Sequence, residues 1–267
     1  MKAKGLVFMI LAILILTGAV FAGGNKEAGG LTLKKGVLSI GMEMTYPPME
    51  FYAEDGKTPL GFDVELGKAI AEKLGLKVNF IDTGWDGIFA GVNSNKYDCI
   101  ISAVTINPAR LAAHNFSKPY VSNTLAMVLH KDSSVTARAP EECVDLNVAF
   151  QTETTADEYM EELGDDGLKY TPRRYDSMIQ CFNELQLGRV DVVVTDLPVA
   201  QDFLSRPDNP FKIVWTGAEE RFGICMKKGN NALTTAINQA LDDLWREGTL
   251  LKISMDTLGT DKVSSAR

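Results

Sequence analysis

The stretch Ser102-Ala103-Val104-Thr105-Ile106-Asn107-Pro108-Ala109-Arg110 decides how this chain folds. It follows the apolar run Cys99-Ile100-Ile101, which is typical of a buried strand. Asn107 and Pro108 indicate a helix start, with an N-cap residue followed by proline at the first helical position. A strand therefore ends, and a helix begins, around Thr105. This junction predicts an α/β sheet that binds its ligand at this edge.

The same junction is suited to an anion. The start of a helix offers free N–H groups and the positive end of the helix dipole. Arg110, one turn further on, has a planar guanidinium that matches a carboxylate with two hydrogen bonds. A plain strand-to-helix turn with a surface arginine is the alternative, and this stretch alone leaves it open.

Composition limits the class of protein. The 267 residues suffice for one large domain or two small ones. A hydrophobic content of 45% and a charged content of 23% are ordinary for a globular protein. The formal net charge of −8 argues against nucleic acid and anionic membrane surfaces as partners.

The N-terminus has the pattern of an export signal. Two lysines precede an apolar stretch, residues 6–20, that is short for a membrane span and is followed by small residues. We expect residues 1–22 to be a signal peptide cleaved near Ala22, and residues 23–30 to be a flexible tether. A retained N-terminal anchor is the alternative. No cysteine lies near the cleavage site, so no lipid anchor is expected.

The cysteines leave two possibilities open. Their spacing does not resemble that of a zinc site, whereas export would permit disulfides. Buried free thiols and structural disulfides are equally compatible with the sequence. The four residues concerned are Cys99, Cys143, Cys181 and Cys225.

Two βαβαβ patterns follow one another along the chain, so parallel sheets are expected. The first comprises a strand at 36–43, a helix at 63–74, a strand at 77–81, a helix at 86–92 and a strand at 97–104. The second comprises a strand at 147–150, a helix at 156–163, a strand at 168–171, a helix at 177–187 and a strand at 190–195.

The two patterns also match residue by residue. At one constant offset, four residues of the first correspond to similar residues of the second, which indicates two similar lobes. Chance similarity of generic helix-turn-strand sequences is the alternative. The pairs are Phe89 and Phe182, Lys96 and Arg189, Asp98 and Asp191, and Ile100 and Val193.

The segments outside these patterns predict how the lobes are joined. Residues 117–131 are extended, and residues 211–215 and 221–227 are again strand-like. Helices are expected at 231–246 and 250–255. If these helices return to the first lobe, the chain crosses between the lobes twice and leaves a cleft with a hinge.

Four further stretches carry recognisable motifs. They are Tyr46-Pro47-Pro48-Met49-Glu50-Phe51, Gly61-Phe62-Asp63-Val64-Glu65-Leu66-Gly67-Lys68-Ala69-Ile70-Ala71, Phe116-Ser117-Lys118-Pro119-Tyr120 and Glu247-Gly248-Thr249-Leu250-Leu251-Lys252-Ile253. In this order they resemble the motifs of the polar amino-acid-binding proteins of bacterial ABC transporters. The likeness extends from about Val37 to Gly259, with one departure at 107–110, where the family usually has Thr-x-Glu-Arg.

This resemblance implies an α/β, two-lobed periplasmic-binding-protein fold with two chain crossings. The first lobe would comprise residues 31–121, the second lobe 122–221, and residues 222–267 would return to the first. It also implies a periplasmic monomer that captures a free polar amino acid, needs no cofactor, and delivers its ligand to an ABC permease.

The resemblance further assigns residues to the α-carboxylate of that amino acid. Arg110 matches the family's arginine and Thr105 its helper hydroxyl. Ala103 stands where serine is common, so only its backbone can contribute. Thr155 would be the contact from the second lobe, although it could instead open a capping box with Glu158. In the turn that leads to Thr155, glutamate at 153 replaces the usual glycine and adopts a positive φ less readily.

Other positions match the rest of the ligand. Asp196 would bind the α-ammonium group, or alternatively cap the helix that follows it. Glu43, Tyr46 and Trp85 would meet the side chain. The aromatic residues could instead belong to the core, and Glu43 could be a solvated strand-end carboxylate. An anionic group in a closed cleft favours arginine, lysine or histidine, then glutamine, and disfavours aspartate and glutamate.

No pattern in the sequence indicates catalysis or metal binding. The two histidines, His114 and His130, lie in no recognisable triad, and neither a phosphate-binding loop nor a metal-ligand cluster is present. We therefore expect a binding protein and not an enzyme. Two alternatives remain: an exported enzyme on the same scaffold, similar to a cyclohexadienyl dehydratase, and a ligand sensor for a receptor.

Overall fold

The computed structural model describes residues 30–267. The expected signal peptide, its cleavage near Ala22, and nearly all of the expected tether lie outside the described residues. Within the described part, no helix is both long enough and apolar enough to cross a membrane.

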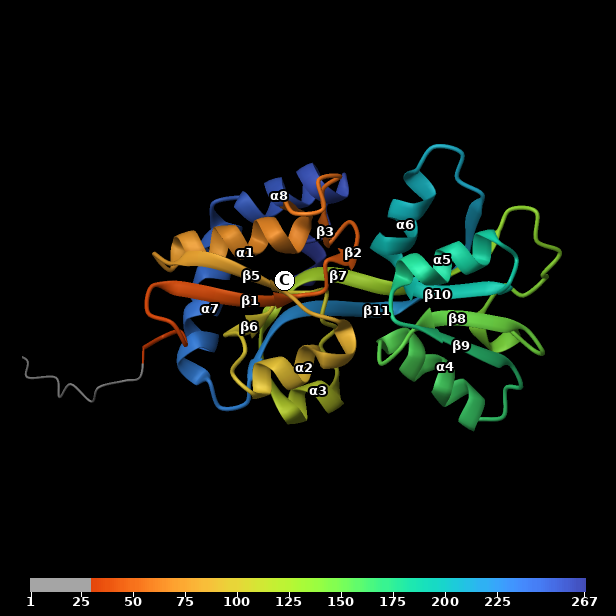
Figure 1. Ribbon diagram of the computed structural model, residues 1–267, viewed down its shortest axis with the longest axis horizontal. Helices are drawn as coiled ribbons and strands as arrows, with labels where there is room; N and C mark the ends of the chain where they lie inside the picture. Colours follow the sequence, from red (N-terminus) through yellow and green to blue (C-terminus); the bar gives the residue numbers. More distant parts are fainter. Residues whose placement is uncertain (1–29) are drawn as a thin grey trace, which may run out of the picture.

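One eight-stranded sheet runs through both lobes (Figure 1). Its strands are β1 (Val37–Met42), β5 (Lys77–Asp82), β6 (Cys99–Ile100), β7 (His114–His130), β8 (Asn147–Gln151), β9 (Thr171–Tyr175), β10 (Val192–Asp196) and β11 (Phe211–Lys227). Their spatial order is β5-β1-β6-β11-β7-β10-β8-β9. A small three-stranded sheet consists of β2 (Thr45–Tyr46), β3 (Glu50–Tyr52) and β4 (Pro59–Leu60).

The two long strands β7 and β11 join the lobes. They are antiparallel and 17 residues long each, and Figure 1 shows them passing from one lobe to the other. Parallel strands flank them on both sides, β5-β1-β6 in the first lobe and β10-β8-β9 in the second. The expected two-lobed α/β fold with two chain crossings is therefore confirmed.

Helices cover both faces of the sheet (Figure 1). They are α1 (Phe62–Lys73), α2 (Trp85–Asn93), α3 (Pro108–Ala113), α4 (Thr155–Asp165), α5 (Met178–Gln186), α6 (Leu197–Ser205), α7 (Asn231–Arg246) and α8 (Thr249–Leu258), with 3₁₀ turns at Pro140–Glu142 and Ser264–Ala266. The last two helices pack against α1, so the chain returns to the first lobe as expected.

Close packing around Tyr97 positions α2, and with it the candidate site residue at its first position. The ring of Tyr97 lies against Gly41 of β1 and Gly91 of α2, where an added Cβ would come within 2.5 Å and 2.1 Å of the ring or its hydroxyl. Only glycine permits this approach. The tyrosine hydroxyl donates to the carbonyl oxygen of Ile88 at 2.5 Å. Trp85, at the start of α2, is thereby held at the carboxyl edge of β1.

Four expected strands differ from the structure. The strand at 97–104 pairs only over Cys99–Ile100, because the chain turns away and Ala103 adopts a φ of 48°. The strand expected at 168–171 is β9, Thr171–Tyr175, an edge strand whose exposed polar side chains carry no apolar pattern. The strands at 211–215 and 221–227 form one strand, β11, whose register shifts between Thr216 and Glu219.

The four cysteines are free thiols, and all are buried. Of the two alternatives, the structure therefore shows the free thiols and not the disulfides. Burial raises the pKa of the Cys181 thiol, and of Cys143 and Cys225 to about 12. These residues act as small hydrophobic side chains in the core.

Candidate functional site

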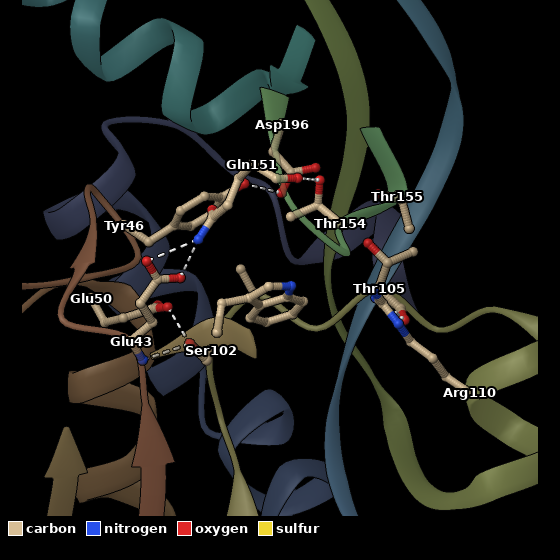
Figure 2. A pocket seen from close by; sticks show the side chains of 12 residues that line it. Glu43, Tyr46, Glu50, Ser102, Thr105, Arg110, Gln151, Thr154, Thr155 and Asp196 are labelled. Carbon is tan, nitrogen blue, oxygen red and sulfur yellow. Dashed lines mark hydrogen bonds between the residues drawn. The ribbon is translucent and has the colours of Figure 1, made fainter. Parts of the chain in front are cut away.

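One pocket lies between the lobes and collects residues from the ends of strands in both (Figure 2). All eight predicted site positions line it, together with four that sequence reasoning did not single out. The predicted positions are Glu43, Tyr46, Trp85, Ala103, Thr105, Arg110, Thr155 and Asp196. The additional ones are Glu50, Ser102, Gln151 and Thr154.

Arg110 lies at one side of this pocket, near Thr105 and Thr155 (Figure 2). It is placed there by the helix start that the sequence predicts, because the Asn107 side chain accepts a hydrogen bond from its N–H at 2.8 Å. The guanidinium donates from Nη1 to the carbonyl oxygen of Thr105 at 3.1 Å. A buried guanidinium is thus held with further N–H donors available for a carboxylate.

The surroundings of Arg110 are partly apolar. Its guanidinium lies 5.5 Å from the ring centroid of Trp85 and 5.3 Å from that of Phe89. Burial lowers the pKa of Arg110, and the carboxylates of Glu158 and Asp196 oppose this effect. An arginine remains charged under these conditions. The side chain is therefore a cation in a dry setting, where an anionic partner interacts strongly.

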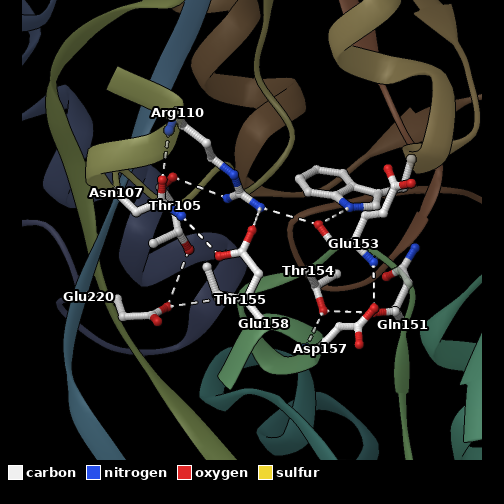
Figure 3. Close-up of polar contacts among 11 residues, drawn as sticks. Thr105, Asn107, Arg110, Gln151, Glu153, Thr154, Thr155, Asp157, Glu158 and Glu220 are labelled. Atoms are coloured by element: carbon white, nitrogen blue, oxygen red, sulfur yellow. Dashed lines mark hydrogen bonds and ion pairs between the residues drawn. The ribbon is translucent and has the colours of Figure 1, made fainter. Parts of the chain in front are cut away.

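The turn before α4 makes hydrogen bonds from one lobe to the other (Figure 3). Glu153 adopts a φ of 60°, so the glutamate takes the left-handed conformation that a glycine would favour. Its N–H donates to Oδ2 of Asp157 at 2.9 Å, which helps to hold the turn. Its carbonyl oxygen accepts from Nε1 of Trp85 at 3.1 Å and from Nη2 of Arg110 at 3.4 Å. The replacement of glycine thus leaves the turn closed on the first lobe.

The capping role considered for Thr155 is wrong. Thr154 is the N-cap of α4, and its hydroxyl accepts from the N–H of Asp157 at 3.3 Å. Thr155 is the first helical residue, and its hydroxyl donates instead to Oε2 of Glu220 at 3.4 Å. The chain enters the helix one residue earlier than the capping pattern indicates, and this frees Thr155 to face the pocket.

Asp196 ends β10 and is buried between the lobes. It occupies the N-cap position of α6, but its side chain makes no capping hydrogen bond. Oδ2 accepts from the Tyr46 hydroxyl at 2.6 Å, and Oδ1 accepts from Nδ2 of Asn123 at 2.5 Å. Burial, and secondly the charge of Glu220, raise the pKa of Asp196 to about 7. A cation placed beside this carboxylate would favour its ionised form.

Glu43 lies on the side of the pocket away from Arg110 (Figure 2). It is 5% exposed, so it is not a solvated strand-end carboxylate. Its two oxygens accept from Nε2 of Gln151 at 2.9 Å and 2.8 Å, and Oε1 accepts from the Thr45 hydroxyl at 2.6 Å. Burial raises the pKa of Glu43, although these hydrogen bonds oppose the shift.

A buried acid pair supports the floor of the pocket. Ser102 donates to Oε1 of Glu50 at 2.5 Å, and the N–H of Ala103 donates to Oδ2 of Asp63 at 2.7 Å. Tyr120 also donates to Asp63, at 2.9 Å. Burial raises the pKa of Glu50, and that of Asp63 to about 7. Because the N–H of Ala103 is engaged here, it is not free for a ligand.

Some of the residues that sequence reasoning missed had a detectable signal. Gln151 is a polar residue that ends a strand directly before the turn at Glu153, and Ser102 is the first residue of the stretch from Ser102 to Arg110. Asn123 and Glu220 had none, because they lie inside the long crossing strands. Within residues 30–267, no group of three histidine, cysteine, aspartate or glutamate side chains could hold a metal ion.

At one side the pocket therefore offers a guanidinium and hydroxyl groups. It offers carboxylates at the opposite side and in the space between the two sides. This arrangement suits a small solute that carries a carboxylate and one or more cationic groups. The profile of the bacterial extracellular solute-binding proteins, family 3, matches residues 38–260, and the chain belongs to that family.

Individual members are similar over nearly their full length. The L-cystine-binding protein TcyA of Bacillus subtilis (strain 168) is 30% identical over 272 residues, which cover 97% of this chain and 98% of the relative. An ancestral arginine-binding protein bound to arginine is 36% identical with a TM-score of 0.80, covering 84% of this chain and 98% of that one. An ancestral amino acid-binding protein, a precursor of cyclohexadienyl dehydratase, is 31% identical with a TM-score of 0.77, covering 84% and 96%.

Proposed function

We propose that this protein binds a free basic amino acid between its lobes and delivers it to an ABC permease. The observation that carries the proposal is that Arg110 of the first lobe and Asp196 of the second line one pocket. An amino acid presents a carboxylate and an ammonium group, and each needs a partner when it is removed from water. Arg110 would receive the first and Asp196 the second.

The pocket also favours a class of side chain. With the α-carboxylate at Arg110 and the α-ammonium at Asp196, the side chain would extend toward Glu43, on the far side of the pocket (Figure 2). A buried carboxylate there attracts a cationic group and repels an anionic one. The similarity to an arginine-bound ancestral protein supports this choice. L-cystine, named for the TcyA relative, also carries a second ammonium group and is the main competitor.

We further propose the extent of each lobe and the location of the protein. The first lobe would comprise residues 31–121 and 222–267, and the second lobe residues 122–221. In support, Ser122 pairs with Arg221 across the two crossing strands, so both proposed boundaries lie at the same level of the ladder. Export by a signal peptide cleaved near Ala22 would place a monomer in the periplasm.

A thermal-shift screen of the twenty amino acids and L-cystine tests the proposed function. A ligand that binds only the folded state raises the melting temperature. We expect the largest shifts with arginine, lysine or histidine. If none of these compounds shifts the transition at millimolar concentration, the proposal is wrong.

Catalysis is the second candidate, and the similarity to a precursor of cyclohexadienyl dehydratase is the observation that favours it. An assay of prephenate turnover separates the two functions. We expect no product above the uncatalysed rate, because the pocket binds a zwitterion through an arginine and an aspartate. Turnover that is lost in Asp196→Asn would establish the enzyme instead.

A further inference from the structure

Glu220 lies on the crossing strand β11 and contacts both lobes (Figure 3). Its Oε2 accepts from the hydroxyl of Thr105 at 3.2 Å and from that of Thr155 at 3.4 Å. Nδ2 of Asn123, on the other crossing strand, donates to the same oxygen at 3.2 Å. One carboxylate oxygen therefore joins a residue of the first lobe, a residue of the second lobe and the segment between them.

The hydroxyl protons of the two threonines are consequently engaged. A threonine hydroxyl has a single hydrogen to donate. Thr105 and Thr155 both direct that hydrogen to Glu220, although both side chains line the pocket beside Arg110. An incoming carboxylate that uses these hydroxyls must first take them from Glu220.

The charge of Glu220 also opposes the binding of an incoming carboxylate. Glu220 and the ligand carboxylate that would replace it both carry a negative charge. Like charges that share the same hydrogen-bond donors repel each other. Burial raises the pKa of Glu220, while its three hydrogen-bond donors and the Arg110 guanidinium lower it. Asn123 also donates to Asp196, so two carboxylates share one amide group beside the ammonium position.

We propose that Glu220 is an affinity-determining residue that competes with the α-carboxylate of the ligand for the hydroxyls of Thr105 and Thr155. The inference rests on the proposed function, because it assigns these hydroxyls to the carboxylate of an amino acid. When the ligand binds, its carboxylate takes the two hydroxyls and Glu220 turns away from them. In the alternative role, Glu220 would join Asp196 in binding the α-ammonium. Removal of its charge would then weaken binding of the ligand.

Calorimetry with L-arginine on the full mature chain tests the inference. Glu220→Gln removes the charge and keeps the size. It should lower the Kd by about tenfold, because the neutral amide accepts from the hydroxyls more weakly than a carboxylate and does not repel the carboxylate of the ligand. Glu219→Gln is the matched control. It removes the same charge one residue away, from an exposed side chain that pairs with Arg221, and should leave the Kd within about twofold.

L-Argininamide, which lacks the carboxylate, provides the second readout. Competition for the carboxylate position predicts that Glu220→Gln strengthens L-arginine binding more than L-argininamide binding. A role in ammonium binding predicts that both ligands bind more weakly. Glu220→Ala serves as a second variant, and it should also bind L-arginine more tightly.

The outcomes separate this inference from the proposed function. If the unmodified protein binds L-arginine and either folded Glu220 variant binds it equally or more weakly, the inference alone is wrong. If a Glu220 variant changes the melting temperature but not the Kd, the inference is likewise wrong. If the unmodified protein binds neither L-arginine nor any other amino acid, the proposed function fails and the inference fails with it.

Discussion

The hydroxyl of Tyr46 lies 2.6 Å from Oδ2 of Asp196, although 150 residues separate them in the chain. Tyr46 belongs to the first lobe, and Asp196 ends strand β10 of the second. The tyrosine is therefore both a wall of the pocket and the donor that satisfies one oxygen of the buried carboxylate. When the lobes are closed, its hydroxyl therefore donates to the carboxylate that would bind the α-ammonium.

We expect Tyr46→Phe to weaken amino-acid binding by roughly tenfold. Leaving a buried carboxylate oxygen without its donor costs about 1–3 kcal/mol, and each 1.4 kcal/mol is a factor of ten in affinity. Calorimetry measures the change. Tyr170→Phe, a half-buried tyrosine outside the pocket, is the control and should bind like the unmodified protein. Equal affinity in Tyr46→Phe would contradict this role of the hydroxyl.

Replacement of Arg110 should have the largest effect of any single change. Arg110→Ala removes one partner of a buried charge pair, which costs about 2–5 kcal/mol, or on the order of two to three decades in affinity. Arg110→Lys should fail as well, because lysine lacks the planar fork. Arg189→Ala, an exposed arginine of the second lobe, should leave binding intact. Unchanged affinity in Arg110→Ala would remove the basis of the site assignment.

The lobes should close on the ligand. Arg110 and Asp196 come from different lobes, so neither lobe completes the site alone, and β7 and β11 provide the hinge. Small-angle scattering should show a smaller radius of gyration when ligand is added. Identical profiles with and without saturating ligand would argue against hinge closure.

Glu43 should determine which side chain is accepted. Calorimetry should rank arginine or lysine above glutamate, and Glu43→Gln should weaken the basic ligands most, because the buried carboxylate attracts a cation. Glu65→Gln, a partly exposed glutamate on α1, is the control. Tight binding of glutamate by the unmodified protein would overturn this specificity and leave amino-acid binding intact.

Stability should fall as the pH rises from about 4 to about 7. Burial raises the pKa of Asp196, and that of Asp63, from 3.8 to about 7, so in this window the folded protein holds protons that the unfolded chain has lost. The free energy of unfolding then decreases with pH, by at most about 1.4 kcal/mol per pH unit for each group. Urea unfolding at pH 5 and pH 7 should show a smaller difference in Asp196→Asn. An equal difference would mean that Asp196 does not titrate in this range.

Several features of the fold and site could be predicted from the sequence because they depend on neighbouring residues. The helix start at Asn107 and Pro108 is a local preference, and it places Arg110 at the edge of the sheet. The short strand before it, Cys99–Ile100, follows equally from a local apolar run. The two matched βαβαβ patterns also indicated the two lobes, since most of the strands and helices carry their own apolar pattern. That Arg110 and Asp196 would line one pocket was implied by the resemblance to amino-acid-binding proteins, and both residues do line it.

The contacts between distant groups depend on tertiary packing. Gln151 binds both oxygens of Glu43, and Glu220 accepts from Thr105 and Thr155, through contacts between residues 65 to 115 positions apart in the chain. No local pattern encodes such pairs, because they depend on how whole elements pack and how the two crossing strands set the lobes against each other. Local sequence therefore specifies most of the helices and strands and their order, whereas the packing of the two lobes sets which partners satisfy the buried charges.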